Sequence, residues 1–340
     1  MHYYPPESRV TPLTIIRRER LLPVQGQVLV RLGETVGPAD VVARCQLPGS
    51  IRVLDVGREL RLRRDRISGT IRKLAGDMVQ ANEVIAAPGG PLGRLRHACR
   101  SPVDGEVIDV REGLLLIQEA GTPFELRAHL KGQVTNVMPN RGVVISAAGA
   151  VIQGVWGNGG EAEGVLKLLV DSPQKPLRSR AIDVSCHGTV VVGGRILDER
   201  LLEQAVEAQV RGMILGSVNA DLASRLAALP FPVLVTEGFG SMPMSDPVFA
   251  LLHANAGREV MVSADTKARW GARRPEAMIP LRAEDEKPAD EAGPRPLQVG
   301  DRVRLLSAPY MGSVGTVRAL PPRPQSVESG GRLPVVVVDL

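Results

Sequence analysis

The sequence contains one pattern twice, as Gly33-Glu-Thr-Val-Gly-Pro-Ala-Asp-Val-Val-Ala43 and as Gly76-Asp-Met-Val-Gln-Ala-Asn-Glu-Val-Ile-Ala86. Weaker echoes begin at Gly105 and Gly132. Alternating Val, Ile and Leu predict half-buried strands, and each Gly-acid pair predicts a tight turn with a positive φ. We therefore expect a glycine-punctuated β-domain over residues 23–171, preceded by an N-terminal arm of residues 1–22.

The composition is that of a chain with several globular domains. Of the 340 residues, 44% are hydrophobic and 23% are charged, which is enough for packed cores in two or three domains. Aromatic residues make up only 3%, whereas Gly (36) and Pro (27) are frequent, and this favours short strands and tight turns. The net charge of +5 permits an acidic partner without requiring one.

Several features predict a cytoplasmic location without contact to a membrane. No run of about 20 apolar residues is present, as a membrane-spanning helix would need. The N-terminus lacks the charged-then-apolar layout of a secretory signal. The three cysteines form no CxxC pair, which argues for a reducing compartment.

Part of the N-terminal half resembles the barrel-sandwich hybrid of biotinyl and lipoyl carrier domains. The resemblance covers Gly69–Ala86 and Ser101–Val107, with Gly26–Ala43 as the partner copy. Carrier domains present a lysine between methionines at a hairpin tip, and neither Lys73 nor Lys131 has such neighbours. We therefore expect a structural β-module used for docking, and no cofactor.

An arginine-rich stretch, Arg58-Glu-Leu-Arg-Leu-Arg-Arg-Asp-Arg66, follows within the same half. As a strand it would bury its leucines and present arginines on the opposite face. Guanidinium groups bind phosphate or carboxylate in a bidentate way, so Arg61, Arg63 and Arg64 are candidate contacts for nucleic acid or an acidic protein. The alternative is a solvated strand whose charge prevents edge pairing.

Residues 176–266 read as a small α/β domain with a parallel sheet. Apolar strands are expected at 189–193, 213–216, 231–236 and 259–262. Helices are expected at 199–209, from a cap at Asn219 or Asp221 through Leu229, and at 247–256. Ligands of such sheets bind beyond the carboxyl ends of the strands. The candidate ligand loop consists of Gly193, Gly194, Gly216, Glu237, Gly238 and Gly240. The alternative is that these glycines serve the backbone alone.

Two further segments contain residues that could bind a partner or a ligand. Phe239, Met242 and Met244 follow the third strand and are expected to form an exposed apolar patch for a protein partner. The glycine-rich segment Gly154–Gly164 could cradle a phosphate, but Glu161 and Glu163 would repel an anion, so we expect a tight turn there.

No catalytic constellation or metal site is predicted. Cys186 and His187 are adjacent, so on a strand they point to opposite faces and cannot act as a pair. His97 and Cys99 supply two ligands, fewer than a zinc site needs.

The last part of the chain reads as a linker followed by a small β-module. An acidic, Pro-rich linker is expected over residues 267–298. It is followed by Val299-Gly-Asp-Arg-Val-Arg-Leu-Leu-Ser-Ala-Pro-Tyr-Met-Gly-Ser-Val-Gly-Thr-Val317. This stretch resembles the KOW motif of small SH3-like barrels in transcription elongation factors and ribosomal proteins. The resemblance implies a barrel over residues 299–340 that binds RNA, RNA polymerase or a ribosomal component. The implied contacts and structural positions are Arg302, Arg304, Tyr310, Gly312, Gly315 and Arg318.

Two questions about this barrel stay open from the sequence. The chain ends just as a strand begins, so the barrel's last strand is either present or missing. The barrel either binds an external partner or docks on another domain of the same chain.

The sequence thus predicts a multi-domain, β-rich protein with a barrel-sandwich-like all-β N-terminal half, a small α/β parallel-sheet domain and a C-terminal SH3-like barrel. The function that fits is a non-enzymatic adaptor whose KOW-like module contacts RNA, RNA polymerase or a ribonucleoprotein. The alternative is a small-ligand sensor or enzyme with its site at the glycine-rich strand ends.

Overall fold

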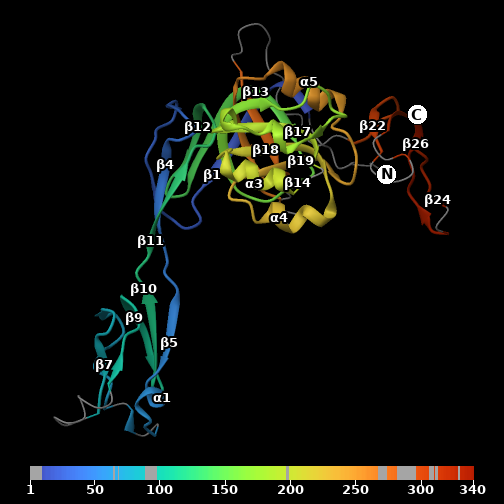
Figure 1. Cartoon of the computed structure of the whole chain (residues 1–340). Coiled ribbons are helices and arrows are strands. Elements are labelled where there is room, and N and C mark those ends of the chain that lie inside the picture. Colours follow the sequence, from blue (N-terminus) through green and yellow to red (C-terminus); the bar gives the residue numbers. More distant parts are fainter. Residues whose placement is uncertain are drawn as a thin grey trace.

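A computed structural model describes residues 10–63, 66–67, 69–88, 98–196, 199–266, 274–281, 296–305, 310, 313–327 and 330–340. Figure 1 shows a mixed body, a long arm that leaves it on one side, and a small C-terminal β-unit on the other. The prediction of a β-rich chain with several sheets is confirmed.

One 12-stranded sheet runs through the whole body. Ten of its strands follow one another in the spatial order β14 (Trp156–Gly157), β19 (Val233–Phe239), β18 (Gly212–Val218), β17 (Thr189–Ile196), β15 (Glu161–Leu168), β20 (Glu259–Ser263), β21 (Glu276–Pro280), β13 (Gly142–Gln153), β12 (Gly132–Met138) and β3 (Thr35–Val36). Two more strands lie off this path: β1 (Val10–Leu21) pairs with β13, and β16 (Pro176–Leu177) pairs with β17. The boundary expected at residues 172–175 therefore does not separate two sheets.

Two further segments differ from expectation because their apolar residues join this sheet. The predicted N-terminal arm contains β1, which pairs with β13 along most of its length and buries Ile16 completely. The predicted linker contains β21, whose Ala277 and Ile279 are fully buried where β21 pairs with β13 and β20. The rest of that linker, at 267–273 and 282–295, lies outside the described residues.

The α/β half of the sheet is covered on both faces. Strands β15, β17, β18 and β19 run parallel in chain order, whereas β20, expected among the parallel strands, pairs antiparallel with β15. The helices are α3 (Arg200–Glu207), α4 (Ala223–Ala227) and α5 (Asp246–Ala254), with short 3-10 turns at Ser179–Ala181, Val184–Cys186 and Ala220–Leu222.

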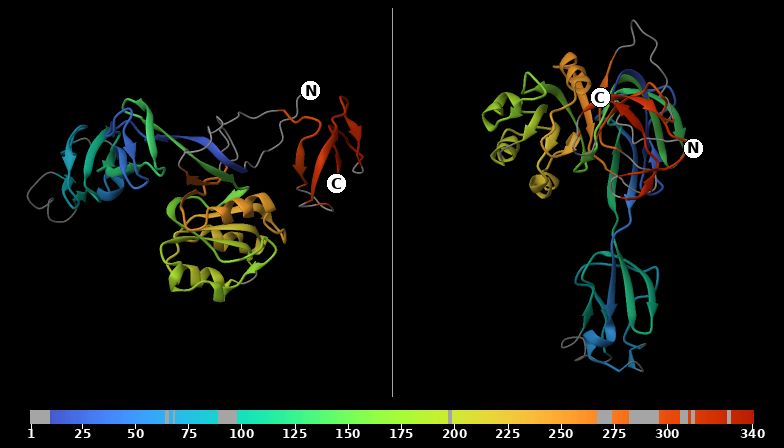
Figure 2. Two further views of the ribbon diagram at one scale, coloured as in Figure 1. Left: turned by 90° about the horizontal axis from the view of Figure 1, so that it is seen from above. Right: turned by 90° about the vertical axis from the view of Figure 1, so that its right-hand side faces the viewer.

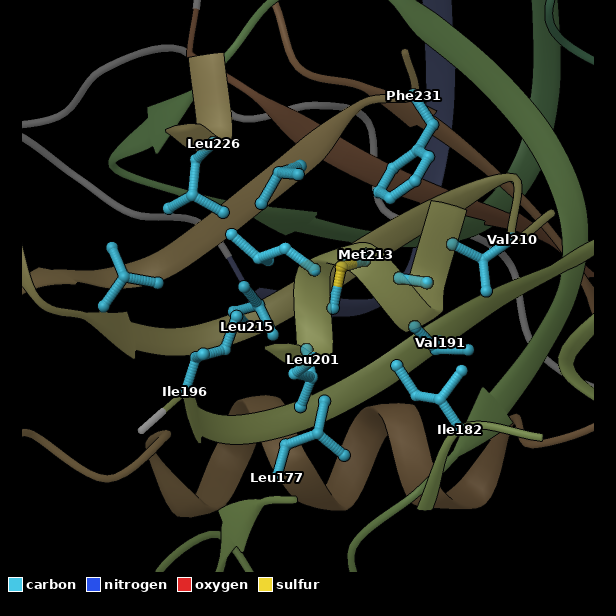
Figure 3. Packing of buried hydrophobic residues seen from close by; sticks show 14 of the residues in the cluster. Leu177, Ile182, Val191, Ile196, Leu201, Val210, Met213, Leu215, Leu226 and Phe231 are labelled. Carbon is cyan, nitrogen blue, oxygen red and sulfur yellow. The ribbon is translucent and has the colours of Figure 1, made fainter. Parts of the chain in front are cut away.

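All seven residues of β18 are buried, as its continuous apolar run requires. Met213 and Leu215 pack toward Leu201 of α3 and Leu226 of α4 (Figure 3). Ile214, between them in sequence, belongs to the cluster formed with Leu252 of α5. The alternation of a strand thus fills two separate cores on either side of the sheet.

The other half of the body wraps a second small sheet against β1, β12 and β13. This sheet consists of β11 (Thr122–Arg127), β4 (Val41–Leu47) and β2 (Gln27–Val28). Val42 and Leu126 from it meet Ile16, Val143 and Ile145 in one core.

The arm leaves the body after β4 and returns into β11, and Figures 1 and 2 show it extended away from the rest of the chain. It holds a four-stranded sheet of β5 (Ile51–Asp55), β10 (Leu114–Glu119), β9 (Gly105–Arg111) and β6 (Met78–Val79), a pair of β7 (Val84–Ala86) and β8 (Cys99–Arg100), and helix α1 (Val56–Leu60). Its own core includes Ile85, Val107, Leu115 and Ile117.

The repeated pattern has a local physical cause. In the first copy, Asp40 accepts the N–H of Gly37 at 2.7 Å, and in the second Glu83 accepts the N–H of Gln80 at 2.9 Å. The acids of the two Gly-acid pairs act in the same way: Glu34 accepts the N–H of Arg31, and Asp77 accepts the N–H of Leu74. Each acid closes a turn, and the valines after the pairs, Val36 and Val79, are buried. The first copy lies in the body and the second in the arm.

The C-terminal module, residues 296–340, shows the same turn: Asp301 accepts the N–H of Gln298 at 2.8 Å, and Gly300 has a φ of 95°. It comprises β22 (Arg302–Arg304), β23 (Val314–Ala319) and β26 (Val337–Asp339) in one sheet, and a hairpin of β24 (Gln325–Ser326) and β25 (Arg332–Leu333). Residues 337–339 therefore form a strand before the chain ends.

The arginine-rich stretch is not a strand over its described residues, so that expectation is wrong. Asp55 caps α1 by accepting the N–H of Arg58 at 3.0 Å, and Leu60 of this helix is buried. Arg61 ends the helix in a left-handed conformation. A favourable N-cap and an apolar i, i+4 pair, Val56 and Leu60, outweigh the alternating pattern.

In the part of the chain that the structure describes, no helix combines the length and apolar character needed to span a bilayer.

Changing Gly142 to Ala should destabilise the fold. A Cβ at this position, where φ is 149°, would lie 2.0 Å from the carbonyl oxygen of Arg20 on β1. We expect a loss of about 2 kcal/mol or more, measured by chemical denaturation. The control is Gly69→Ala, because a Cβ there meets nothing within 4 Å. Equal stability of the two variants would contradict the close β1–β13 packing.

Candidate functional site

Two residues predicted for different roles meet in the structure. Glu237, from the candidate ligand loop, forms an ion pair with Arg304, from the KOW-like motif. The side chains are 3% and 20% exposed, respectively. The contact joins the carboxyl end of β19 to the C-terminal module.

Groups of the body hold the Glu237 carboxylate in place. Its Oε1 accepts the backbone N–H of Ser245 at 2.8 Å and contacts the hydroxyl of Thr236 at 3.2 Å. Ser245 is the N-cap of α5, so the carboxylate lies at the positive end of that helix. The other oxygen, Oε2, contacts Nη1 of Arg304.

Arg304 is less well satisfied than its partner. Its Nη2 donates to the carbonyl of Pro243 at 3.5 Å, and its buried Nε has no hydrogen-bond partner among the described residues. Burial lowers the pKa of Arg304, although a guanidinium remains charged at neutral pH.

The glycines of the candidate ligand loop are packed against the chain itself. A Cβ on Gly194 would lie 2.3 Å from the carbonyl oxygen of Lys175, one on Gly193 would lie 2.6 Å from Leu177, and one on Gly216 would lie 2.9 Å from the backbone nitrogen of Met244. Gly238 and Gly240 have φ values of 107° and 131°. These glycines thus have packing and backbone reasons to be present, and Glu237 is the group of this set that offers ligand chemistry.

The prediction of an exposed apolar patch is wrong for the two methionines, Met242 and Met244. Met242 is 8% exposed and Met244 is 1% exposed, because the segment after β19 folds back over the strand ends. The hydroxyl of Ser217 donates to the Met242 carbonyl at 2.6 Å and holds this segment down. Phe239 is 39% exposed and packs edge-on against Trp156, with ring centroids 5.6 Å apart.

The other predicted contacts of the module lie on its surface. Arg302 on β22 is exposed, Tyr310 is 57% exposed, and Arg318 on β23 lies 3.4 Å from Asp339. A Cβ on Gly315 would lie 2.4 Å from the carbonyl oxygen of Asp339 on β26, so the glycine permits close approach of that strand. Gly312 lies outside the described residues.

The arginines of the arm lie far from the module. Arg61 and Arg63 are exposed near α1, at the tip of the arm and at the opposite end of the molecule from β22 in the views of Figures 1 and 2. Arg64 lies outside the described residues.

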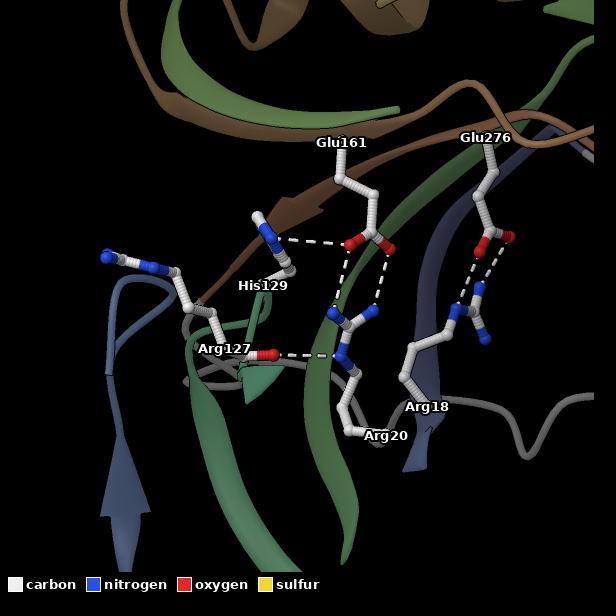
Figure 4. Close-up of polar contacts among 6 residues, drawn as sticks. All are labelled: Arg18, Arg20, Arg127, His129, Glu161 and Glu276. Atoms are coloured by element: carbon white, nitrogen blue, oxygen red, sulfur yellow. Dashed lines mark hydrogen bonds and ion pairs between the residues drawn. The ribbon is translucent and has the colours of Figure 1, made fainter. Parts of the chain in front are cut away.

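A second polar cluster was not predicted (Figure 4). Arg20 of β1 donates to both carboxylate oxygens of Glu161 at 2.7 and 2.9 Å, and His129 Nε2 lies 3.3 Å from Glu161. Arg18 forms a similar fork with Glu276 at 2.7 and 2.6 Å. These pairs tie β1 to β15 and β21. Their members are so distant in sequence that no local pattern could have indicated them.

An open, polar hollow of about 360 Å³ adjoins this cluster. It is lined by Glu19, Arg20, Leu21, Leu126, His129, Gly160, Glu161 and Asp265. Because Arg20 binds Glu161 at both oxygens, the cluster acts as a clamp between strands. The repulsion of anions expected from Glu161 is offset by this arginine.

The described residues offer neither a metal site nor an activated thiol. No group of three or more His, Cys, Asp or Glu side chains among them could hold a metal ion. All three cysteines are buried, and burial raises the pKa of the Cys99 thiol to about 11.

Comparison with known proteins adds no assignment: no protein-family model, no curated protein and no solved structure matches this chain significantly.

The folded chain should become less stable as the pH is lowered, because of His129. Burial is the main cause that lowers the pKa of His129 below its usual 6.5, although Glu161 opposes the shift. The folded chain thus favours the neutral imidazole, and the unfolded chain takes up a proton first as the pH falls below about 7. We expect His129→Asn to flatten the decrease in Tm between about pH 7 and 5, since Asn tolerates the φ of 48° at this position.

The control for this titration is His187→Asn, which replaces an exposed histidine and should keep the wild-type slope. A His129 variant with an unchanged slope would contradict the role of its burial.

Proposed function

We propose that this protein is a non-enzymatic adaptor whose C-terminal KOW-like module contacts RNA or an RNA-containing assembly. The observation that carries the proposal is the separation of the two arginine-bearing surfaces. Arg302 and Arg318 lie on the module, and Arg61 and Arg63 lie at the far tip of the arm. Surfaces at opposite ends of a molecule suit a protein that bridges partners better than one that encloses a substrate.

We further propose a fold for each of three parts of the chain. The Gly300–Asp301 turn, the three-stranded sheet and the strand packing at Gly315 support an SH3-like barrel at 299–340. The sheet of β5, β10, β9 and β6, with the β7–β8 pair, supports a barrel-sandwich-like module. The parallel strands β15, β17, β18 and β19, with helices on both faces, support an α/β unit.

The exposed side chains of the module suit a single-stranded nucleic acid. Arg302 and Arg318 can pair with phosphates, and Tyr310 offers a ring on which a base can stack. RNA polymerase and a ribosomal component are other partners that the KOW resemblance implies.

The second candidate function is a small-ligand sensor at the strand ends. The Glu237 carboxylate favours it, because a buried carboxylate is a strong recognition group for a cation, the role that Arg304 fills in this structure. The glycines around it are covered by the chain's own segments, so the adaptor is the better-supported function.

The adaptor proposal predicts salt-dependent RNA binding by the module. In fluorescence anisotropy with a single-stranded RNA of about ten nucleotides, Arg302→Ala with Arg318→Ala should weaken binding about tenfold. The dependence of log K on log salt should become shallower by about 0.7 for each phosphate contact removed. The matched control is Arg258→Ala, which changes an exposed arginine on the surface of the body. Unchanged affinity and slope would contradict RNA binding through this surface.

The arm makes a separate, length-dependent prediction. Arg61→Ala with Arg63→Ala should leave binding of the ten-nucleotide RNA unchanged, because the arm tip lies away from the module. The same change should weaken binding of a long RNA that can reach both ends, measured by the same anisotropy titration. Equal loss for both RNAs would contradict two independent surfaces.

A further inference from the structure

The chain contains a pair of acceptors, the Glu237 carboxylate and the Pro243 carbonyl, whose occupant comes from another module. Thr236 and Glu237 lie on β19, and Pro243 and Ser245 lie in the connection from β19 to α5, so the body alone supplies these groups. Arg304 belongs to β22 of the C-terminal module. The acceptors therefore remain on the body if the module moves away.

These acceptors match a guanidinium group. Glu237 presents Oε2 while Oε1 is held by Ser245, and the Pro243 carbonyl provides a second acceptor for the same cation. A planar fork of N–H donors can reach both acceptors at once, whereas an ammonium is a compact point charge. A carboxylate with 3% side-chain exposure also requires a cation close by.

Arg304 fits these acceptors imperfectly. Its Nε is buried without an acceptor in the described structure, and its contact to Pro243 is long at 3.5 Å. A guanidinium group that enters with freer geometry can keep Nε hydrated and still pair with Glu237. An external guanidinium group can thus compete with Arg304 for the site. The advantage of Arg304 is that the chain tethers it close by.

We propose that Glu237 and the Pro243 carbonyl form a guanidinium-binding site, which Arg304 occupies in this structure and from which an arginine side chain of a protein partner displaces it. Displacement frees the Arg304 face of the C-terminal module. The site does not depend on RNA binding by the module, so the two proposals can fail separately.

The test uses the full-length chain and the tripeptide acetyl-Gly-Arg-Gly-amide, followed by isothermal titration calorimetry. Arg304→Ala should bind the tripeptide at least about tenfold more tightly than the wild type, because the tethered arginine competes at an effective concentration in the millimolar range. Adding Glu237→Gln to Arg304→Ala should abolish the binding. The citrulline tripeptide, which has the same shape without the charge, should not bind.

Two outcomes would overturn the proposal. One is equal affinity of the wild type and Arg304→Ala for the arginine tripeptide. The other is equal binding of the arginine and citrulline tripeptides. Loss of RNA binding in the Arg302 and Arg318 variants affects neither outcome.

A second measurement tests the site without Arg304→Ala, in case that variant does not fold. Small-angle X-ray scattering of the wild type should show a larger radius of gyration with excess arginine tripeptide and no change with the citrulline tripeptide. Glu237→Gln should show the increase without any peptide. The matched control, Glu259→Gln, changes an exposed glutamate of β20 and should keep the wild-type radius. A radius that does not respond to the arginine tripeptide or to Glu237→Gln would contradict the site.

Discussion

Strand β13 is the constraint on which the arrangement of the body depends. It pairs with β1, β12 and β21, and so it joins the all-β half of the chain to the α/β half in one hydrogen-bonded sheet. The two arginine–carboxylate forks from β1 add charge-assisted hydrogen bonds across the same junction. With this junction fixed, the arm leaves the body at β4 and β11, and the carboxyl end of β19 presents Glu237 to the C-terminal module.

Local features of the fold were predictable because they depend on neighbours in sequence. The acids of the repeat close turns over three residues, as Asp40 and Glu83 do, and the continuous apolar run around Ile214 marks a strand buried on both faces. The helix at Val56–Leu60 could also have been found, because Asp55 is a favourable N-cap. The alternation of Leu and Arg obscured that signal.

The pairing of distant strands was not predictable from the same patterns. Nothing near β15 indicates that it lies between β17 and β20, and nothing near Ala277 indicates that it extends the sheet beyond β20. The burial of Met242 and Met244 also depends on tertiary structure, since it results from the backbone folding over Gly216. Likewise Glu237 and Arg304 were each recognised for their chemistry, but their contact depends on how two modules pack.

We propose that the C-terminal module contacts RNA, while Arg304 holds the module on the body. Ultraviolet crosslinking of the full-length chain to RNA, with peptide mapping, tests this most directly. We expect crosslinked peptides from residues 299–340, and strong loss of crosslinking in a chain that ends at Gln298. Equal crosslinking of both chains, or crosslinks confined to the body, would contradict it.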